Sequence, residues 1–280
     1  MRPTWLFEAD SLGPSMAPRL RSEVNRQGFN FGIIHHETFS SGYLTRAGDH
    51  QLQEQDCIVF IGTWPLWRHI QLHWPSWIPG GWCSTENLDC GAYYPKFEPF
   101  LLNKNHAMMT GIDAIKRQAE IFAAFALDGR VFVRPTGCVK VFTGRCVDAA
   151  TYSTALAPTR YDPATRVVVA QPRVLGREWR FVIADHRPIA VSQYYDAGEK
   201  HGERGCPRTV WTFVEKVLGQ VSWEPDHLFI MDVSECDGAY YVLELNGFSC
   251  AGFYECDLAA IVSSASEIAL RAWNASRGAA

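Results

Sequence analysis

Two polar residues with a spacing of two, Glu244 and Asn246, interrupt an apolar stretch near the end of the chain. We predict a strand over residues 240–246, in which successive side chains alternate between the two faces. Glu244 and Asn246 then share one face with Tyr240 and Val242. Burying a carboxylate and an amide side by side in an apolar strand is costly unless they have a partner. Because their oxygen atoms are ligands that hard divalent cations prefer, the pattern indicates a Mg²⁺ site.

A second carboxylate, Asp232, falls on a strand predicted over residues 227–234, and Asp237-Gly238 marks the turn that follows. A hairpin loop of three or five residues places Asp232 on the face of Glu244, whereas a two-residue loop places it on the opposite face. Without a bound metal ion, clustered carboxylates repel each other, and the pKa of one should rise. The alternative is a solvated strand face with Asp232 in a loop.

A basic pair follows a predicted strand in the middle of the chain. Arg134 ends the strand over residues 130–134, and Lys140, one of only six lysines, comes six residues later. Gly137 and Gly144 bracket the loop that contains Lys140. Arginine, lysine and free backbone N–H groups together can hold phosphate. The Gly-x-x-x-x-Gly-Lys-Ser/Thr motif is absent, so this is no Walker loop, and a hairpin with exposed basic tips is an equal alternative.

Glu178 and Arg180 form a third cluster. They are two residues apart on a predicted strand, so their side chains share a face. Just before them, residues 167–175 end a buried strand in a linker that Pro172 interrupts. Free backbone donors and acceptors in such a linker could hold the edge of an adenine ring. The alternative is a surface Glu–Arg ion pair, which would contribute little to stability.

Composition limits the classes of function. The chain has 280 residues, of which 47% are hydrophobic and 20% charged, and its net charge is −4. These values are typical of a folded protein of one or two domains. Neither part of the chain is basic, which argues against an extended nucleic-acid surface. Since no apolar run reaches the ~18 residues of a membrane span and Glu8 and Asp10 precede any signal-peptide core, we expect a cytoplasmic protein.

Cysteines and tryptophans are frequent but give weaker signals. The nine cysteines include no Cys-x2-Cys pair, so we expect reduced thiols packed as small apolar residues. A redox or metal role for Cys250 and Cys256 is the alternative. Residues 64–82 contain five of the ten tryptophans, and His69 and His73 share a helix face there. We expect aromatic packing in this segment rather than a zinc pair.

The pattern of secondary structure changes near residue 105. Before this point, short apolar strands alternate with helical segments, as in a small α/β layer. After it, the pattern predicts a helix over residues 112–127, an extended segment over 139–142 and a closing helix over about 258–275. Mixed strands and helices of this kind indicate an α+β fold.

The order and spacing of these clusters resemble the ATP-grasp superfamily, and most closely its clade named for two arginines and one lysine. The resemblance extends from about Gly62 to Asp257. It implies an ATP-grasp domain of two α+β subdomains over residues 106–280, with a hinge near 171–175, after an α/β domain over 1–105. The resembling motifs are Pro79-Gly80, Tyr93-Tyr94-Pro95, Leu101-Leu-Asn103, Phe132-Val-Arg-Pro135, Lys140, Phe142-Thr-Gly144, Glu178-Trp-Arg180, Asp232, Glu244-x-Asn246 and Ala251-Gly-Phe-Tyr254.

The resemblance implies a site for ATP. Lys140 would lie in the loop over the phosphates, and Arg134 stands where many relatives carry a lysine. The linker backbone would hold the adenine, and Glu178 would reach the ribose. The residues expected to bind the nucleotide are therefore Arg134, Lys140, Gln171, Pro172, Arg173 and Glu178.

The resemblance also implies a reaction centre. Arg180 would bind the γ-phosphate or the acceptor carboxylate and is the expected catalytic residue. Asp232, Glu244 and Asn246 would hold Mg²⁺. One departure from the family pattern is the segment 103–105, Asn-Lys-Asn, which lacks the acidic residue expected there.

From this resemblance we expect an ATP-dependent carboxylate–amine ligase that forms an amide or peptide-type bond through an acyl phosphate and releases ADP. Its substrates would be a carboxylate and an amine, on an amino acid, a peptide or a protein side chain. Two alternatives remain open, namely a phosphotransferase of the same fold and a nucleotide-binding protein without turnover.

Overall fold

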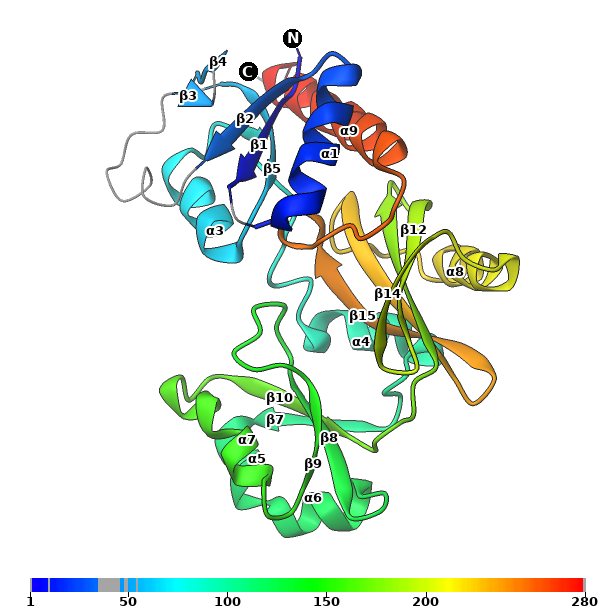
Figure 1. The fold of residues 1–280 in the computed structure, drawn as a ribbon. Helices are drawn as coiled ribbons and strands as arrows, with labels where there is room; N and C mark the ends of the chain where they lie inside the picture. Colours follow the sequence, from blue (N-terminus) through cyan, green and yellow to red (C-terminus); the bar gives the residue numbers. More distant parts are fainter. Residues whose placement is uncertain (1, 10, 35–45, 48–49, 54, 279–280) are drawn as a thin grey trace.

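The computed structural model describes residues 2–9, 11–34, 46–47, 50–53 and 55–278. Three main sheets follow one another along the chain, and Figure 1 shows the second of them in a separate lower body. Among the described residues, no helix is both long enough and apolar enough to cross a membrane.

The first sheet is parallel, with strand order β2-β1-β5-β6, and confirms the predicted α/β layer. Every residue of β1 and of β5 is buried, as expected for parallel strands that helices cover on both faces. A short separate pair, β3 (Arg46–Ala47) and β4 (His50–Gln51), follows β2. The remaining elements of the layer are β1 (Thr4–Glu8), α1 (Gly13–Arg26), β2 (Asn30–Ile34), β5 (Cys57–Ile61), α3 (Trp64–His73) and β6 (Ile78–Pro79).

The last helix of the chain, α9 (Leu258–Gly278), packs on this first sheet beside α1, although it is the most distant element in sequence (Figure 1). Its buried residue Ile261 belongs to the same core as Trp5 of β1. The indole of Trp5 also donates a buried hydrogen bond to Ser266 Oγ at 3.0 Å. The C-terminal end of the chain therefore completes the N-terminal layer.

The second sheet is antiparallel, with strand order β7-β10-β8-β9. The helices beside this sheet pack on it and share one core with its strands, which contains Ala114, Ile121 and Val133. Its elements are β7 (His106–Thr110), α5 (Gly111–Lys116), α6 (Gln118–Phe125), β8 (Arg130–Pro135), β9 (Arg145–Asp148), α7 (Tyr152–Ala155), η2 (Ala157–Tyr161) and β10 (Arg166–Ala170).

Two predictions for this region are wrong in detail. The helix predicted over residues 112–127 is interrupted at Arg117, whose φ and ψ of −98° and 23° let α5 and α6 each turn a buried side chain to the core. The segment predicted as extended over residues 139–142 is irregular. Phe142 is buried in the core of the second sheet, while Val139 and Val141 are exposed, so these apolar residues do not share a strand face.

The third sheet is antiparallel, with strand order β13-β12-β11-β14-β15. One face packs on α8 and α4, while Val182 and Ile230 join the core of the first sheet. Its elements and the helices beside it are α4 (Cys90–Phe97), η1 (Glu98–Phe100), β11 (Arg177–Ala184), β12 (Arg187–Asp196), β13 (Glu199–Arg204), α8 (Arg208–Gln220), β14 (Leu228–Cys236), β15 (Ala239–Gly247) and η3 (Phe248–Cys250).

Two connectors join the second and third sheets. Residues 171–176 lead from β10 to β11, and residues 101–105 lead from η1 to β7. The second connector runs beside β15, since Leu101 forms a parallel bridge with Val242. The mixed architecture confirms the predicted α+β fold, and the two connectors form one wall of the site described next.

Candidate active site

A bulge in the β14–β15 hairpin brings the two predicted metal-binding carboxylates together. The loop has only two residues, Asp237 and Gly238. Regular pairing from this loop would place Asp232 opposite Leu243 and turn Glu244 to the other face. The register instead shifts by one residue beside Asp232, which therefore pairs with Glu244. A β-bulge of this kind inserts one residue and restores the shared face that the loop length alone would have removed.

The same bulge contradicts two parts of the sequence prediction. The loop has neither three nor five residues, and Tyr240 and Val242 do not share a face with Glu244. Val242 is fully buried in the core beneath the third sheet, and Tyr240 packs against that core. The prediction that Glu244 and Asn246 lie together is confirmed, because Asn246 Nδ2 donates to Glu244 Oε1 at 3.1 Å and to Asp232 Oδ2 at 3.2 Å.

Asp232 is fully buried and is held by Arg180 of the neighbouring strand β11. Arg180 donates from Nε to Oδ1 at 2.9 Å and from Nη2 to Oδ2 at 2.7 Å, which is the bidentate geometry that arginine offers a carboxylate. Its remaining nitrogen, Nη1, donates to the carbonyl of Gly252 at 3.0 Å. Arg180 thus joins a buried carboxylate of the sheet to the segment after η3.

Glu244 is paired with two cations from the second sheet and its loop. Arg134 Nη2 lies 3.0 Å from Oε2, and Lys140 Nζ lies 2.9 Å from Oε1. Arg134 is buried at the end of β8, and Lys140 belongs to residues 136–144, which we call the 136–144 loop. These ion pairs connect the second sheet to the third across the space between them.

The two carboxylates have opposite pKa shifts. Burial raises the pKa of Asp232 above its ordinary value; Arg180 lowers it, and nearby Glu244 raises it further. Burial also tends to raise the pKa of Glu244, but Arg134 and Lys140 outweigh it and lower the pKa to about 2. The expected rise of one pKa is therefore found at Asp232, with burial rather than repulsion as its leading cause.

An aromatic pair lies over Arg180, formed by Tyr254 of the Ala251-Gly-Phe-Tyr254 motif and by Tyr194, which the sequence prediction missed. The rings of Tyr194 and Tyr254 stack with centroids 4.9 Å apart, and the Arg180 guanidinium lies 5.5 Å and 5.0 Å from them. The Tyr194 hydroxyl donates to Glu178 Oε2 at 2.9 Å. The sequence did predict a strand over residues 188–195, which is β12 in the structure and pairs with the strand that carries Glu178 and Arg180. Alternation along it could have placed Tyr194 beside them.

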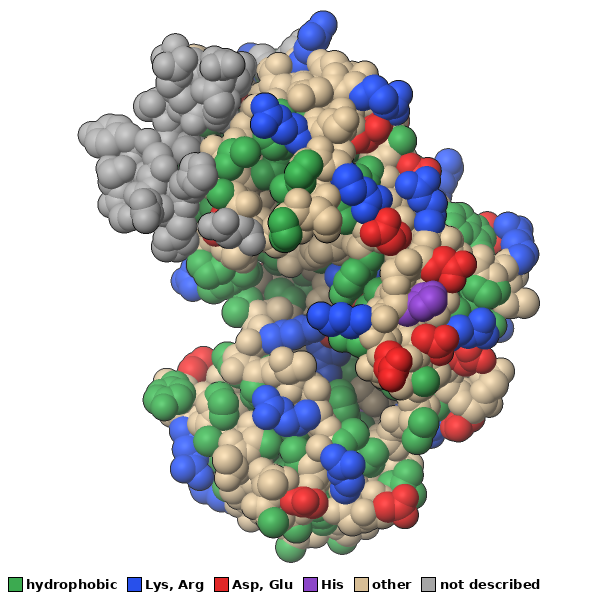
Figure 2. Space-filling view, in the orientation of Figure 1, with side chains coloured by type: hydrophobic (Ala, Val, Ile, Leu, Met, Phe, Trp, Pro, Cys, Tyr) green, Lys and Arg blue, Asp and Glu red, His purple; other side chains and the backbone are tan. Residues whose placement is uncertain are grey.

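These side chains surround a cavity of about 490 Å³. Figure 2 shows the molecular surface hollowed above the lower body, with Lys and Arg side chains around the hollow. Six of the residues predicted from the sequence line this cavity, namely Arg134, Lys140, Glu178, Arg180, Asp232 and Glu244.

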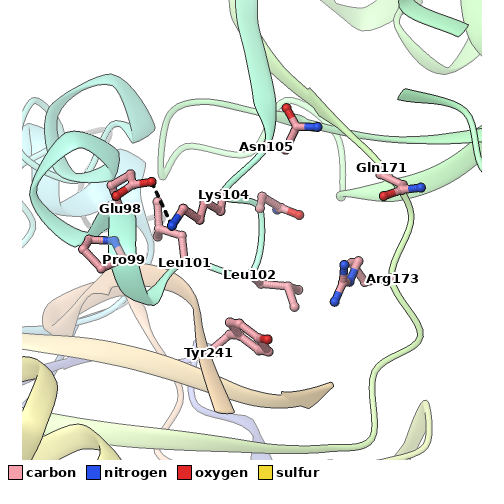
Figure 3. A pocket seen from close by; sticks show the side chains of 10 residues that line it. Glu98, Pro99, Leu101, Leu102, Lys104, Asn105, Gln171, Arg173 and Tyr241 are labelled. Atoms are coloured by element: carbon pink, nitrogen blue, oxygen red, sulfur yellow. Dashed lines mark ion pairs between the residues drawn. The ribbon is translucent and has the colours of Figure 1, made fainter. Parts of the chain in front are cut away.

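A second cavity, of about 500 Å³, lies between the two connectors. Figure 3 shows Gln171 and Arg173 on one side of it, the segment 98–105 opposite, and Tyr241 of β15 facing the space. Pro172 is among the residues that the structure describes, and it lines neither of these two cavities. Asn103 lines both cavities, which therefore adjoin each other.

The segment 103–105, where the family pattern predicts an acid, contributes a cation to the second cavity instead. Lys104 Nζ lies 3.3 Å from Glu98 Oε1, the ion pair drawn in Figure 3. Asn103 beside it is buried. Glu98, which comes from η1, is the carboxylate that lines this cavity among the residues of the segment 98–105.

The chain belongs to an ATP-grasp family. The model of the family described as "ATP-grasp domain, R2K clade family 2" matches residues 115–263, more than half of the chain. The matched range includes every predicted site residue described above. No curated protein matches the sequence.

Solved structures of ATP-grasp enzymes share the fold. A D-alanine–D-alanine ligase from Bacillus anthracis in complex with ATP matches with a TM-score of 0.63 and 12% identity over 99% of each chain. The D-cycloserine synthetase DcsG matches with a TM-score of 0.62 and 12% identity over 96% of this chain and all of its own. The ATP-grasp ligase PsnB, complexed with a minimal precursor, matches with a TM-score of 0.57 and 13% identity over 94% of this chain and 97% of its own.

Proposed function

We propose that this protein is an ATP-dependent carboxylate–amine ligase, which forms an amide or peptide-type bond through an acyl phosphate and releases ADP. The observation that carries the proposal is a pair of carboxylates, buried Asp232 and half-buried Glu244, that three cations hold around one cavity. Membership of the ATP-grasp family and the likeness to structures named as ligases support it.

The triphosphate would bind in the first cavity. Arg134, Lys140 and Arg180 supply three positive charges, and the carboxyl groups of Asp232, Glu244 and Glu178 line the same cavity. The planar guanidinium groups suit phosphate oxygens, and bound Mg²⁺ would offset the charge of the carboxylates. Because Lys140 is partly exposed and lies in a loop, it can move from Glu244 to a phosphate oxygen more easily than buried Arg134 can.

Mg²⁺ fits the donors present, provided that the nucleotide completes its coordination. Among the described residues, no group of three or more His, Cys, Asp or Glu side chains is arranged to hold a metal ion alone. Asp232, Glu244 and Asn246 offer two carboxylates and one amide oxygen, and the octahedral ion usually takes further oxygens from phosphate and water. The Asn246 amide, whose nitrogen faces both carboxylates, would have to turn its oxygen to the ion. Bound there, Mg²⁺ would offset phosphate charge during transfer.

The adenosine would extend from the first cavity into the second. Gln171 and Arg173 line the second cavity, and Tyr241 offers an aromatic ring to a base. Pro172 would contribute only through the linker backbone. Glu178, whose pKa is raised chiefly by burial, is held in place by the Tyr194 hydroxyl and would accept a hydrogen bond from the ribose.

The chemistry proposed here depends mainly on position and charge. A carboxylate oxygen of the acceptor attacks the γ-phosphorus of ATP, the bond to the β-phosphate oxygen breaks, and ADP leaves. The nitrogen lone pair of an amine then attacks the acyl carbon and displaces phosphate, and the amine loses a proton. Arg180 would hold the acceptor carboxylate or the transferred phosphoryl group, and Arg134 and Lys140 would offset the developing charge.

A phosphotransferase would need the same residues and would stop after phosphate transfer. A nucleotide-binding protein without turnover could dispense with the two carboxylates, Asp232 and Glu244, that line the first cavity, and this argues against it. The two enzyme activities differ in one respect. A ligase requires an amine to form its product, whereas a phosphotransferase does not.

The proposal is tested by measuring ADP release from MgATP in the presence of amino acids and dipeptides, with mass spectrometry of the products. We expect one carboxylate and amine combination to stimulate ADP release and to give a product lighter than the summed substrates by one water. Arg180→Lys should retain the fold and lose most turnover. The ammonium group of lysine cannot make the two parallel hydrogen bonds by which a guanidinium binds a carboxylate or a phosphate group.

The matched control is Arg177→Lys, which alters a partly exposed ion pair with Glu235 on the same strands. It should retain turnover. A phosphorylated product that accumulates whether or not an amine is present would support the phosphotransferase instead. Near-normal kinetics for Arg180→Lys would remove Arg180 from the reaction centre.

A further inference from the structure

Tyr254 has a backbone conformation that a bulky side chain rarely adopts. Its φ of 48° lies in the left-handed region, which is costly for any residue other than glycine and most of all for a large one. Tyr254 is also 40% exposed, so filling the core does not explain its size. Strained residues of this kind concentrate at active sites and in segments that hold ligands. A tyrosine in so unfavourable and open a position indicates a role toward a ligand.

The segment that carries Tyr254 is attached on both sides of this residue. Two residues before it, the carbonyl of Gly252 accepts a hydrogen bond from Arg180 Nη1 at 3.0 Å. The residue after it, Glu255, forms an ion pair at 3.0 Å with Arg19 Nη1 of α1. The ring of Tyr254 is therefore presented from a segment that the first layer and the third sheet both hold.

Tyr254 belongs to an aromatic wall of the first cavity that also contains Tyr194 and Tyr195. Tyr254 stacks on Tyr194 with an interplanar angle of 11°. Regular alternation would turn Tyr194 and Tyr195 to opposite faces, but the pairing of β12 with both of its neighbours skips Tyr194. Tyr195 therefore pairs with Glu178 and shares its face. Such bulges re-aim side chains and are frequent beside active sites, and this one adds a third ring to the cavity.

Arg180, beside this wall, has N–H groups left for a ligand. A guanidinium has five N–H donors. Two of them donate to Asp232 and one to the Gly252 carbonyl, and the described part of the chain supplies no further hydrogen bond to this side chain. The other two can bind a carboxylate without releasing Asp232. Because Arg180 Cζ lies 5.0 Å from the centroid of the Tyr254 ring, a carboxylate bound there would bring its adjoining group close to that ring.

We propose that Tyr254 is a specificity-determining residue for the acceptor, and that the acceptor is a carboxylate with an apolar or aromatic group beside its carboxyl carbon. Arg180 binds the carboxylate, and the ring of Tyr254 packs against the adjoining group. A flat group gains most, because aromatic rings pair in stacked or edge-to-face contacts. The choice of a carboxylate rests on the proposed function, whereas the contact itself requires no turnover.

The first test measures how two carboxylate probes, 3-phenylpropionate and acetate, bind the full chain with and without MgADP, by ligand-detected NMR. We expect 3-phenylpropionate to bind about tenfold more tightly than acetate, the size of one good aromatic contact. Tyr254→Phe keeps the ring and should keep this preference, whereas Tyr254→Asn should abolish it. The matched control is Tyr161→Asn, which changes an exposed tyrosine of η2 and should retain the preference.

Equal binding of the two probes to the wild type, or a preference that survives in Tyr254→Asn, would overturn the assignment. Loss of the preference in Tyr254→Phe would also overturn it, because the hydroxyl rather than the ring would then make the contact. A chain that forms no amide product with any amine contradicts the proposed function. The two probes still decide the role of Tyr254 in that case, since their binding does not depend on a reaction.

A second measurement separates recognition from a purely structural role. Asparagine adopts the left-handed region more readily than tyrosine, so relief of strain should offset the lost stacking in Tyr254→Asn. We therefore expect its urea unfolding midpoint to be no lower than that of the wild type, although the probe preference is lost. A midpoint well below the wild-type value would show that Tyr254 serves the fold, and this would overturn the argument from strain.

Discussion

Glu244 is held by two ion pairs, so removing its charge affects stability as well as chemistry. Glu244→Gln leaves buried Arg134 without its carboxylate, which should lower the free energy of unfolding by about 3 kcal/mol in metal-free buffer. From the sequence alone, repulsion between clustered carboxylates predicts that the free energy of unfolding hardly falls, or rises, in this variant. Urea unfolding measures the change. Glu120→Gln, which removes an exposed partner of Arg117, is the control and should cost at most about 1 kcal/mol.

Lys140 should contribute to nucleotide affinity more than to folding, because its side chain is partly exposed. MgATP at a hundredfold excess over its dissociation constant should stabilise the wild type by about 2.7 kcal/mol. Lys140→Ala should show a smaller thermal shift at the same concentration, since one phosphate contact is lost. Lys116→Ala, at the end of α5, is the control. Equal shifts in the Lys140 and Lys116 variants would show that Lys140 is not a phosphate ligand.

At the residue scale, the sequence predicted most of the side chains that gather at the site. Spacing by two on a strand was sufficient for Glu178 with Arg180 and for Glu244 with Asn246. The pairing of Lys140 with Glu244 was not predictable, because it joins a loop of one sheet to a strand of another.

At the element scale, the β14–β15 hairpin shows where a sequence pattern is insufficient. A turn at Asp237-Gly238 was predictable, but the bulge that pairs Asp232 with Glu244 was not. Alternation predicts a face only while pairing stays regular, and one inserted residue reverses every later assignment. The 136–144 loop shows a similar limit, since Phe142 packs in the core of the second sheet and the segment predicted as extended is irregular.

The free energy of unfolding should depend on pH through Asp226, a residue of the loop before β14 that accepts a hydrogen bond from Ser84 in the segment after β6. Burial raises the pKa of Asp226 to about 6, although the Ser84 N–H lowers it. The folded chain then binds a proton more tightly than the unfolded chain, so this group lowers the free energy of unfolding as pH rises from about 4 to about 6. Asp226→Asn keeps the shape and should remove this loss.

Chemical unfolding of the wild type and of Asp226→Asn across this range provides the measurement. The advantage of the variant should grow with pH between about 4 and about 6 and then level off. Asp113→Asn, which changes an exposed residue of the first turn of α5, is the control for general charge effects. A stability difference that does not change with pH would show that Asp226 titrates normally.

At the scale of the whole molecule, the sequence predicted the order of the layers but not how the ends of the chain meet. Strand and helix patterns indicated an α/β layer followed by an α+β region. The packing of α9 on the first sheet depends on long-range contact between apolar faces, such as Ile261 with the core of Trp5, which periodicity alone does not reveal. The two adjoining cavities likewise arise from two connectors that are distant in sequence.

The most direct test is a crystal structure of the chain with a non-hydrolysable ATP analogue and Mg²⁺. The account predicts the base between the two connectors and the phosphates on Arg134 and Lys140. It also predicts Mg²⁺ at about 2.1 Å from oxygens of Asp232, Glu244 and Asn246. A triphosphate bound outside the first cavity, or a metal ion without Asp232 and Glu244 among its ligands, would contradict it.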